Sequence, residues 1–280
     1  MAVRAQSGSR AAAAVLALAC AALPTSQIAQ SAAGPGAEQF KMLELVNLER
    51  ASRDLAPLVW NETLARLAAA HARDMSRAGR ISHNSSSDGA TFSQRAARSD
   101  LRARAVAENV GVAPDLVTAH RGLMDSPGHR ANILDGKLGA VGIGLAWSPD
   151  GRDLYVTQDF AAVLPDLNDV EAATALRGAL RRAANGRSLP EDDALSRRLA
   201  DAAARLSRAD SVTGHDIVAP PPSWVFTFTS LDPDTLPKDL AKRVAEARGF
   251  GLGVAFARTK STPLGAWWVA VVLTEGTAQP

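Results

Sequence analysis

Two histidines and one glutamate are the side chains of this sequence best suited to metal or acid–base chemistry. His129 follows Pro127 and Gly128, which we expect to end a helix and to place the imidazole at a bend. His83 and Glu108 lie upstream of it. Two neutral imidazoles and one carboxylate resemble the ligand set of catalytic zinc sites, which keep a fourth position open for water. A divalent cation is therefore expected if the fold brings these three side chains together.

Other kinds of chemistry have no matching motif. The sequence contains no Gly-rich phosphate loop, no Cys-x-x-Cys pair and no His-Glu-x-x-His helix, which argues against nucleotide binding and zincin-type proteolysis. The formal net charge is +2 and the arginines are scattered, so no basic run predicts nucleic-acid binding. Ser126 has no adjacent base in the sequence, and we do not expect it to be a nucleophile.

The elements that must position these side chains follow from the spacing of apolar residues. The pattern predicts helices over residues 38–53, 61–79 and 114–126, and strands over residues 141–147 and 154–160. Asn61 is expected to cap the second helix, and Ser148-Pro-Asp-Gly151 is expected to form a hairpin turn. Residues 84–104 are polar and should form a wrapping loop with one helical turn. Helices that flank a small antiparallel sheet make an α+β fold, an α-β-α sandwich.

Several blocks of this region resemble, in order and spacing, the CAP superfamily of cysteine-rich secretory proteins, antigen 5 and plant pathogenesis-related 1 proteins. The blocks that carry the resemblance are Leu43–Arg50, Leu64–Met75, Ser82–Asn84, Glu108–Val110, Ser126–Leu134 and Tyr155–Phe160. The sequence is most similar to the bacterial secreted branch of this family, whose domain is also called SCP. The resemblance covers less than half of the chain and implies an α-β-α sandwich over residues 38–163.

The family resemblance also implies a central cleft in which two histidines and two acidic residues can hold a divalent cation. His83, Glu108 and His129 match three of these positions. The fourth position holds Ser126, and the neighbouring Asp125 is rotated from it by about 100° on a helix. We therefore expect a cleft of His83, Glu108, His129, Asp125 and Ser126, with Zn²⁺ or another divalent cation on His83, His129 and Glu108.

Two interpretations of the three matching side chains stay open. They form a metal centre, or Glu108 accepts hydrogen bonds from both imidazoles in a buried structural knot. The missing second acid weakens catalysis more than metal binding, because hydrolysis needs a further base or a group that orients the histidines. No catalytic residue is assigned, and a metal-dependent hydrolase or peptidase that uses His83, Glu108 and His129 is the alternative function.

Five other polar residues near these motifs are expected to have structural roles. His71 lies on the apolar stripe of its helix and should be a core or boundary residue, whereas His120 should lie at the surface or at the edge of the cleft. Asn109 is expected to bond the backbone near the end of its strand. Arg130 and Asn132 are expected to brace the bend that carries His129.

Residues 168–276 have the pattern of a degenerate second copy of the first half. Leu189–Arg205 parallels Leu58–Arg73, and Gly251–Phe256 parallels Gly142–Trp147. The stretch that carries the site has no counterpart. We predict a CAP-like second domain without the site, and the alternative is convergent patterning of Ala/Leu helices and Gly-x-Gly strands.

The amino-terminal segment, residues 1–33, predicts export. Arg4 and Arg10 precede the apolar run Ala11–Leu23, which is too short for a stable membrane anchor, and small residues follow it. The alternative is an Ala-rich start of a cytosolic chain. Cys20 is the only cysteine, so the mature chain is expected to form no disulfide. A membrane attachment is expected only if Cys20 is lipidated.

The sequence as a whole favours a secreted or periplasmic binding module of the bacterial cell envelope. The resemblance implies lipids, sterols, cell-envelope components and partner proteins as the classes of ligand. A second domain without the site favours binding over catalysis, because it still supplies surface. A structural envelope protein without a small ligand is a further possibility, since fold does not determine function.

Overall fold

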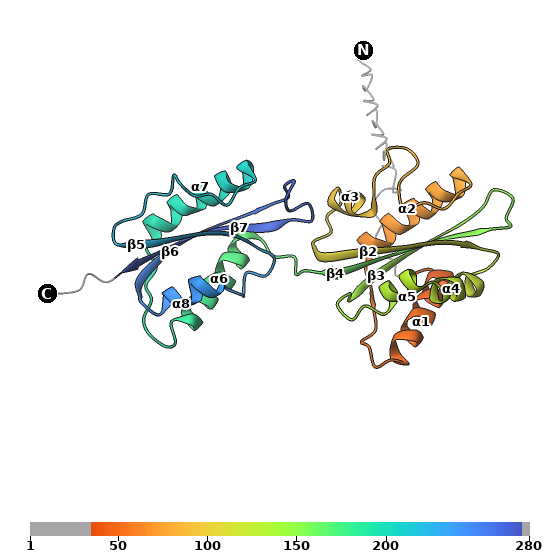
Figure 1. Cartoon of the computed structure of the whole chain (residues 1–280), viewed down its shortest axis with the longest axis horizontal. Coiled ribbons are helices and arrows are strands. Elements are labelled where there is room, and N and C mark those ends of the chain that lie inside the picture. The colour runs from red at the N-terminus through yellow and green to blue at the C-terminus, as the bar shows by residue number, and fades with distance from the viewer. Residues whose placement is uncertain (1–34, 276–280) are drawn as a thin grey trace, which may run out of the picture. The chain divides into compact units, whose positions relative to one another are not determined.

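The computed structural model describes residues 35–275 of the chain. The predicted signal segment, with Cys20, lies outside the described residues. Within residues 35–275, no helix is long and apolar enough to cross a membrane. Figure 1 shows two β-sheets, each with helices on both faces.

The first half is a mixed sheet between two layers of helices, which confirms the predicted α-β-α sandwich. Its elements are α1 (Ala37–Ala51), β1 (Val59–Trp60), α2 (Glu62–Ala78), α3 (Phe92–Ala97), β2 (Ala103–Ala113), α4 (Leu116–Asp125), α5 (Pro127–Ile133), β3 (Ala140–Trp147) and β4 (Leu154–Val163). The strand order is β1-β3-β4-β2, and the β1–β3 pair is parallel. Helices α2 and α3 lie on one face of this sheet, and α1, α4 and α5 lie on the other (Figure 1).

The local signals in the sequence account for most element ends in this half. The side chain of Asn61 accepts a hydrogen bond from Leu64 N at 3.0 Å and caps α2, as predicted. Gly79 ends α2 in the left-handed conformation, with φ 64°. The polar segment 84–104 contains α3, whose capping box pairs Thr91 with Gln94. The β3–β4 hairpin turns at Ser148, whose N–H donates to Asp153 O at 2.7 Å.

The prediction that His129 lies at a bend was wrong. Helix α4 ends at Asp125, and a new helix, α5, begins at Pro127. A proline is tolerated in the first turn of a helix because the N–H groups there have no partner within the helix. His129 therefore lies on a helical turn that a proline begins, not on a bend that a proline creates.

Two glycines let α2 approach β3 closely. A Cβ at Gly142 would overlap the backbone of Leu64 and Ala65, and one at Gly144 would overlap the backbone of Ala68. Because β3 presents only hydrogen atoms at these two positions, α2 packs directly against the strand backbone. This contact determines how close α2 lies to the sheet. It therefore also determines the positions of the α2 side chains that face β2 and β4.

The second half repeats this arrangement with fewer strands. Its elements are α6 (Asp169–Ala183), α7 (Asp193–Ala209), β5 (Ser223–Ser230), α8 (Lys238–Val244), β6 (Ala247–Ala257) and β7 (Ala266–Glu275). The strand order is β5-β7-β6. A parallel bridge from Glu191 to Phe250 lies on the outer side of β6, where β1 pairs with β3 in the first half. Gly253 approaches α7 at Leu199 as Gly144 approaches α2.

The strand registers align the two halves residue by residue. In the first half, one rung of the sheet joins Glu108, Asp159 and Gly142. The corresponding rung of the second half joins Val225, Val272 and Gly251. Two valines thus stand where the first half has two carboxyl groups. This correspondence supports the prediction of a CAP-like second domain without the site, and a duplication stays our proposal.

Candidate functional site

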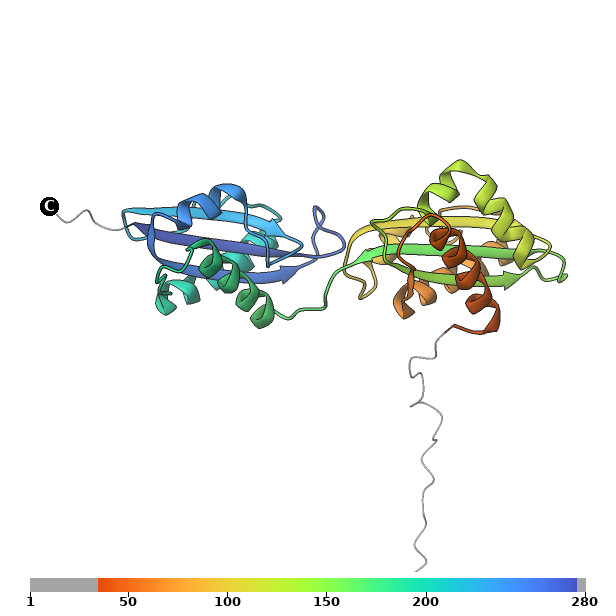
Figure 2. The same ribbon diagram turned by 90° about the horizontal axis from the view of Figure 1, so that it is seen from below.

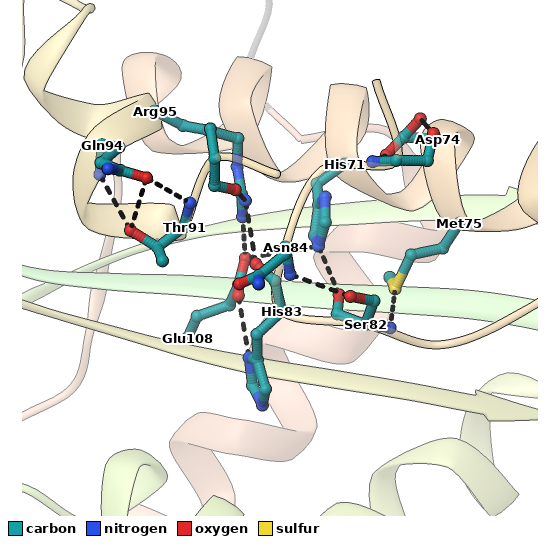
Figure 3. Close-up of polar contacts among 12 residues, drawn as sticks. His71, Asp74, Met75, Ser82, His83, Asn84, Thr91, Gln94, Arg95 and Glu108 are labelled. Atoms are coloured by element: carbon teal, nitrogen blue, oxygen red, sulfur yellow. Dashed lines mark hydrogen bonds and ion pairs between the residues drawn. The ribbon is translucent and has the colours of Figure 1, made fainter. Parts of the chain in front are cut away.

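Glu108 of β2 is the centre of the polar cluster in the first half (Figure 3). Its side chain is only 4% exposed. His83 donates from Nδ1 to Oε1 of Glu108 at 2.9 Å, and the Arg95 guanidinium binds Oε2. The carboxylate is therefore held between a cation and an imidazole, which stabilise its charge inside the protein.

Arg95 is fixed in place by α3 and by the loop before it. Its Nη1 donates to His83 O at 3.0 Å and to Ala90 O at 2.9 Å, and the guanidinium carbon lies 5.7 Å from the centre of the Phe92 ring. The capping box at the start of α3 orders the same loop. Arg95 thus joins the segment that carries His83 to the sheet through Glu108.

Asp159 of β4 lies opposite Glu108 in the β2–β4 ladder. It is fully buried, and within residues 35–275 neither of its carboxyl oxygens has a hydrogen-bond partner by geometry. Burial, and then the charge of Glu108, raise the pKa of Asp159 well above its usual range. The folded protein therefore favours the neutral acid, which has one O–H to donate and has Glu108 as its neighbouring acceptor.

His71 of α2 completes the buried side of the cluster. Its Nε2 donates to Ser82 O at 2.7 Å and lies 3.8 Å from Oε2 of Glu108. Burial, followed by the charge of Arg95, lowers the pKa of His71, although Glu108 opposes this shift. The prediction of a core position is confirmed, and the side chain is a neutral donor to the Ser82 carbonyl that precedes His83.

His129 approaches the cluster from α5 but has no hydrogen bond to Glu108 within residues 35–275. Burial, and then the nearby His83, lower the pKa of His129. The carbonyl of His129 accepts a hydrogen bond from Asn109 Nδ2 at 3.0 Å. Within residues 35–275, Glu108 thus has a hydrogen bond from the His83 imidazole but none from the His129 imidazole.

A network of side-chain amides, which was not predicted, holds α5 against the sheet. Asn132 Nδ2 donates to Asn109 Oδ1 at 2.9 Å, and Asn109 Nδ2 donates to Gln158 Oε1 at 3.0 Å. Arg130 Nη1 donates to Met124 O at 2.7 Å, which ties α5 to the end of α4 and confirms its bracing role. These bonds determine where α5 presents His129.

Arg50 holds the other end of α5 from inside the core. This arginine of α1 is only 1% exposed, and burial lowers its pKa. Its guanidinium donates to four backbone carbonyls at 2.8 to 3.2 Å, those of Ala56, Ile133, Asp135 and Leu138. The carbonyl oxygens at the end of α5 thus accept hydrogen bonds from a guanidinium cation. A positive charge at this end of a helix is favourable, because the helix dipole is negative there.

Within residues 35–275, neither of the two residues predicted near the position of the second acid forms a hydrogen bond or an ion pair with Glu108. Asp125 is exposed at the end of α4, and Ser126 occupies the N-cap of α5 without a side-chain capping bond. The second acid of the cluster is Asp159, which the sequence reasoning missed. A carboxyl residue inside a central strand, between the apolar residues at its two ends, was the signal that could have found it.

Arg95 is the other functional residue that sequence reasoning missed. It lies in the polar segment 84–104, where arginines are frequent and no spacing rule distinguishes one from the next. His120 was predicted at the surface or the cleft edge, and this was wrong. It is 7% exposed, and its Nε2 lies 3.8 Å from Oε1 of Glu49, between α1 and α4.

The donor set in this arrangement does not fit a metal ion. Within residues 35–275, no group of three His, Cys, Asp or Glu side chains is placed to hold one. Arg95 supplies the positive charge that a metal would bring to the Glu108 carboxylate, so this carboxylate is engaged in an ion pair instead. The geometry matches a hydrogen-bonded knot, in which Arg95 takes the place predicted for His129.

A separate apolar groove of about 650 Å³ runs along α1. Its apolar lining comes from α1 and the loop after it: Phe40, Leu43, Leu45, Leu48, Ala51, Leu55 and Pro57. Phe40 is 50% exposed and Leu48 is 66% exposed, which is high for side chains of this type. Lys41, Glu44 and Asn47 give the groove a polar rim.

Comparison with known proteins links the first half to one family. The model of the CAP family, the cysteine-rich secretory proteins, matches residues 43–160. No curated protein matches the chain. Among solved structures, an extracellular SCP-domain protein from Bacillus anthracis is 29% identical, with a TM-score of 0.40, and the match covers 44% of this chain and 40% of that one.

Two further solved structures match a similar share of the chain. An outer surface protein from Borrelia burgdorferi is 18% identical, covers 44% of this chain and 92% of its own, and has a TM-score of 0.41. A cysteine-rich secretory protein from Staphylococcus aureus is 21% identical, covers 45% of this chain and 38% of its own, and has a TM-score of 0.36. The chain thus spans less than half the length of the B. anthracis and S. aureus proteins that it matches.

Proposed function

Because residues 43–160 belong to the cysteine-rich secretory protein (CAP) family, we propose that this chain is an exported CAP-domain protein that acts as an extracytoplasmic binding module. The observation that carries the choice of binding over hydrolysis is the state of Glu108. Both of its oxygens already have partners, Oε1 with His83 and Oε2 with Arg95. A general base or a metal ligand must direct a lone pair at the substrate or ion, and a carboxylate paired with a guanidinium is a weaker base and a weaker ligand.

The groove along α1 is the part of this domain that best suits a ligand. It is apolar, and two of its lining side chains, Phe40 and Leu48, are at least half exposed. Binding a hydrocarbon chain there would remove this surface from water, which favours association. We therefore propose a lipid or another apolar envelope component as the ligand, with the polar rim facing its head group.

Titration with a fluorescent fatty acid, cis-parinaric acid, tests this function. The wild type should bind it, and Leu48→Ser should weaken the affinity by about tenfold or more, because a leucine side chain contributes about 1.5–3 kcal/mol when buried. Val59→Ser is the matched control, since Val59 is 67% exposed but lies outside the groove. Absence of binding by the wild type, or an equal loss in both variants, would contradict the proposal.

A metal-dependent hydrolase is the second candidate, and one observation favours it. Burial and His83 lower the pKa of His129, so this imidazole is unprotonated at neutral pH, as a metal ligand must be. In that case His83, His129 and Glu108 would hold Zn²⁺ or another divalent cation, after Arg95 has released the carboxylate.

Zinc calorimetry on the wild type, His83→Ala and His129→Ala distinguishes the two candidates. The binding module predicts no stoichiometric heat, because Arg95 already neutralises Glu108. Stoichiometric binding that disappears in both histidine variants would establish a metal centre and would favour the hydrolase.

A further inference from the structure

The strand β5 forms an open edge of the second sheet. It pairs with β7 along all eight residues, Ser223 to Ser230, without a break in register. β7 separates it from β6, so its other side has no neighbouring strand among residues 35–275. In Figure 2 it is the light-blue strand along one border of its sheet.

The hydrogen-bond pattern shows which backbone groups of β5 face outward. Glu275 N donates to Pro222 O at 3.0 Å, so this pair of opposite residues is hydrogen-bonded. Hydrogen-bonded and non-bonded pairs alternate in an antiparallel ladder. The N–H and C=O groups of Val225, Thr227 and Thr229 therefore point away from β7, and no other backbone group within residues 35–275 bonds them.

The β5 edge itself carries no charge, proline or bulge that would protect it from pairing, although the hydroxyl of Thr227 donates to Val212 O in the preceding loop. Natural edges carry charged residues, prolines or bulges. The equivalent strand of the first half, β2, has an irregular register between Ala103 and Val106 and carries Arg104 and Glu108. β5 reads Ser-Trp-Val-Phe-Thr-Phe-Thr-Ser, with no charge and no proline, and Val225 is 41% exposed. Such an edge is suited to accept another strand.

The groove beside this edge is charge-balanced. It measures about 700 Å³ and lies between the aromatic side of β5 and the helix α8. Its charged lining is two acids and two bases, Asp239, Glu246, Lys242 and Arg243. Arg243 pairs with Glu246 at 2.8 Å and lies 5.0 Å from the centre of the Trp224 ring. A surface with both signs of charge can meet a copy of itself without net repulsion.

We propose that β5 pairs antiparallel with β5 of a second copy of this chain, about a two-fold axis at Thr227. In this register Val225 lies opposite Thr229 of the partner subunit, and Phe226 lies opposite Phe228 of the partner subunit. Opposite residues of an antiparallel pair share one face, so both pairings keep the aromatic rings on the α8 side. The outward groups of Val225, Thr227 and Thr229 then form about six backbone hydrogen bonds.

A self-complementary edge favours a second copy over an unrelated peptide. A two-fold axis at Thr227 places each outward residue opposite another outward residue of the same strand. The resulting interface is isologous and closes at two subunits, the commonest symmetry of soluble oligomers. The inference is independent of the function proposed for the first half, because every residue it uses belongs to the second half.

Charge substitution on the exposed face of β5 tests both the dimer and its register. In Val225→Lys/Thr229→Lys, each lysine faces a lysine of the partner subunit, and like charges opposite each other destabilise a ladder. In Val225→Lys/Thr229→Glu, each lysine faces a glutamate instead. Sedimentation equilibrium of the full chain from about 1 to 100 µM should show a dimer for the wild type and the Lys/Glu variant, and a monomer for the Lys/Lys variant.

Two results would overturn the proposal. One is a wild type that stays monomeric over the whole concentration range. The other is a Lys/Glu variant that dissociates as fully as the Lys/Lys variant. Circular dichroism checks that both variants are folded. Val225→Pro is a second probe, because it removes an outward N–H without removing a bond to β7, and it should also give a monomer.

Discussion

At the scale of single residues, Glu108 and Asp159 are two neighbouring carboxyl groups with different surroundings and different charge. Glu108 is paired with Arg95 and His83, whereas no cation of residues 35–275 pairs with Asp159. Two buried carboxylates in adjacent positions cannot both ionise without a large repulsion. The cluster therefore holds one negative charge on Glu108, one positive charge on Arg95 and a neutral acid at Asp159.

Asp159→Asn should remove a pH-dependent loss of stability. Well below the ordinary aspartic acid pKa of about 3.9, the acid is protonated in the folded and the unfolded chain alike. As pH rises from there, the unfolded chain releases the proton while the folded one retains it, because the pKa of Asp159 is raised. The free energy of unfolding of the wild type therefore falls as pH rises towards that raised pKa. Asparagine cannot ionise, and its amide N–H can donate to Glu108 as the neutral acid does.

Urea unfolding at about pH 5 and pH 8 measures this difference. We expect the stability of Asp159→Asn relative to the wild type to increase with pH. His71 titrates in both proteins, so its contribution cancels in the comparison. Asp201→Asn is the control, since Asp201 is exposed on α7 and should show no such trend. A difference that does not change with pH would mean that Asp159 is ionised in the folded protein.

At the scale of elements, the contact between α2 and β3 positions the whole buried side of the site. α2 carries His71, and its depth is determined by Gly142 and Gly144 on β3. The opposite layer is positioned differently, by the Arg50 hydrogen bonds and the amide network around Asn132. Glu108 lies between the layers because β2 and β4 are held in register along most of their length.

Gly144→Ala should destabilise the first half strongly. The added methyl group would overlap the Ala68 backbone, which cannot move without shifting α2. We expect a loss of about 3 kcal/mol in the free energy of unfolding, at the upper end for overpacked positions. Chemical denaturation measures it.

Gly122→Ala on α4 is the matched control for this prediction. A Cβ at Gly122 meets nothing within 4 Å, and alanine favours a helix, so a gain of about 0.5–1 kcal/mol is expected. Similar effects of the two substitutions would show that the α2–β3 contact is not tightly packed.

At the scale of the whole molecule, the chain builds separate hydrophobic cores from its two halves. The largest cluster of the first half joins α1, α4 and α5 to its sheet and includes Val46, Ile133 and Phe160. The largest cluster of the second half joins α6 and α8 to theirs and includes Leu176 and Phe250. Neither cluster shares a residue with the other. We therefore propose that each half is a folding unit.

Gly253→Ala should unfold the second half selectively. Its Cβ would overlap the Leu199 backbone of α7, as at the equivalent position of the first half. Amide hydrogen exchange should show lost protection in β6 and β7, while β3 and β4 stay protected. A loss of protection in both halves together would refute independent folding.

The sequence determined the local structure and much of the first half. Apolar periodicity predicted α1, α2, α4, β3 and β4, and Asn61 and the turn at Ser148 marked two of their ends, because capping and turn preferences act over a few residues. The family motif paired His83 with Glu108 although they are 25 positions apart. The repeated Gly-x-Gly strand also pointed to the second sheet.

Only the tertiary structure decided which groups complete the site. Arg95 reaches Glu108 because a short helix packs over β2, and Asp159 meets Glu108 because of the register between two strands that are distant in sequence. His129 lies on the helix that begins at Pro127, and within residues 35–275 it makes no hydrogen bond to Glu108. Register, packing depth and burial depend on the whole chain at once, so short-range patterns cannot specify them.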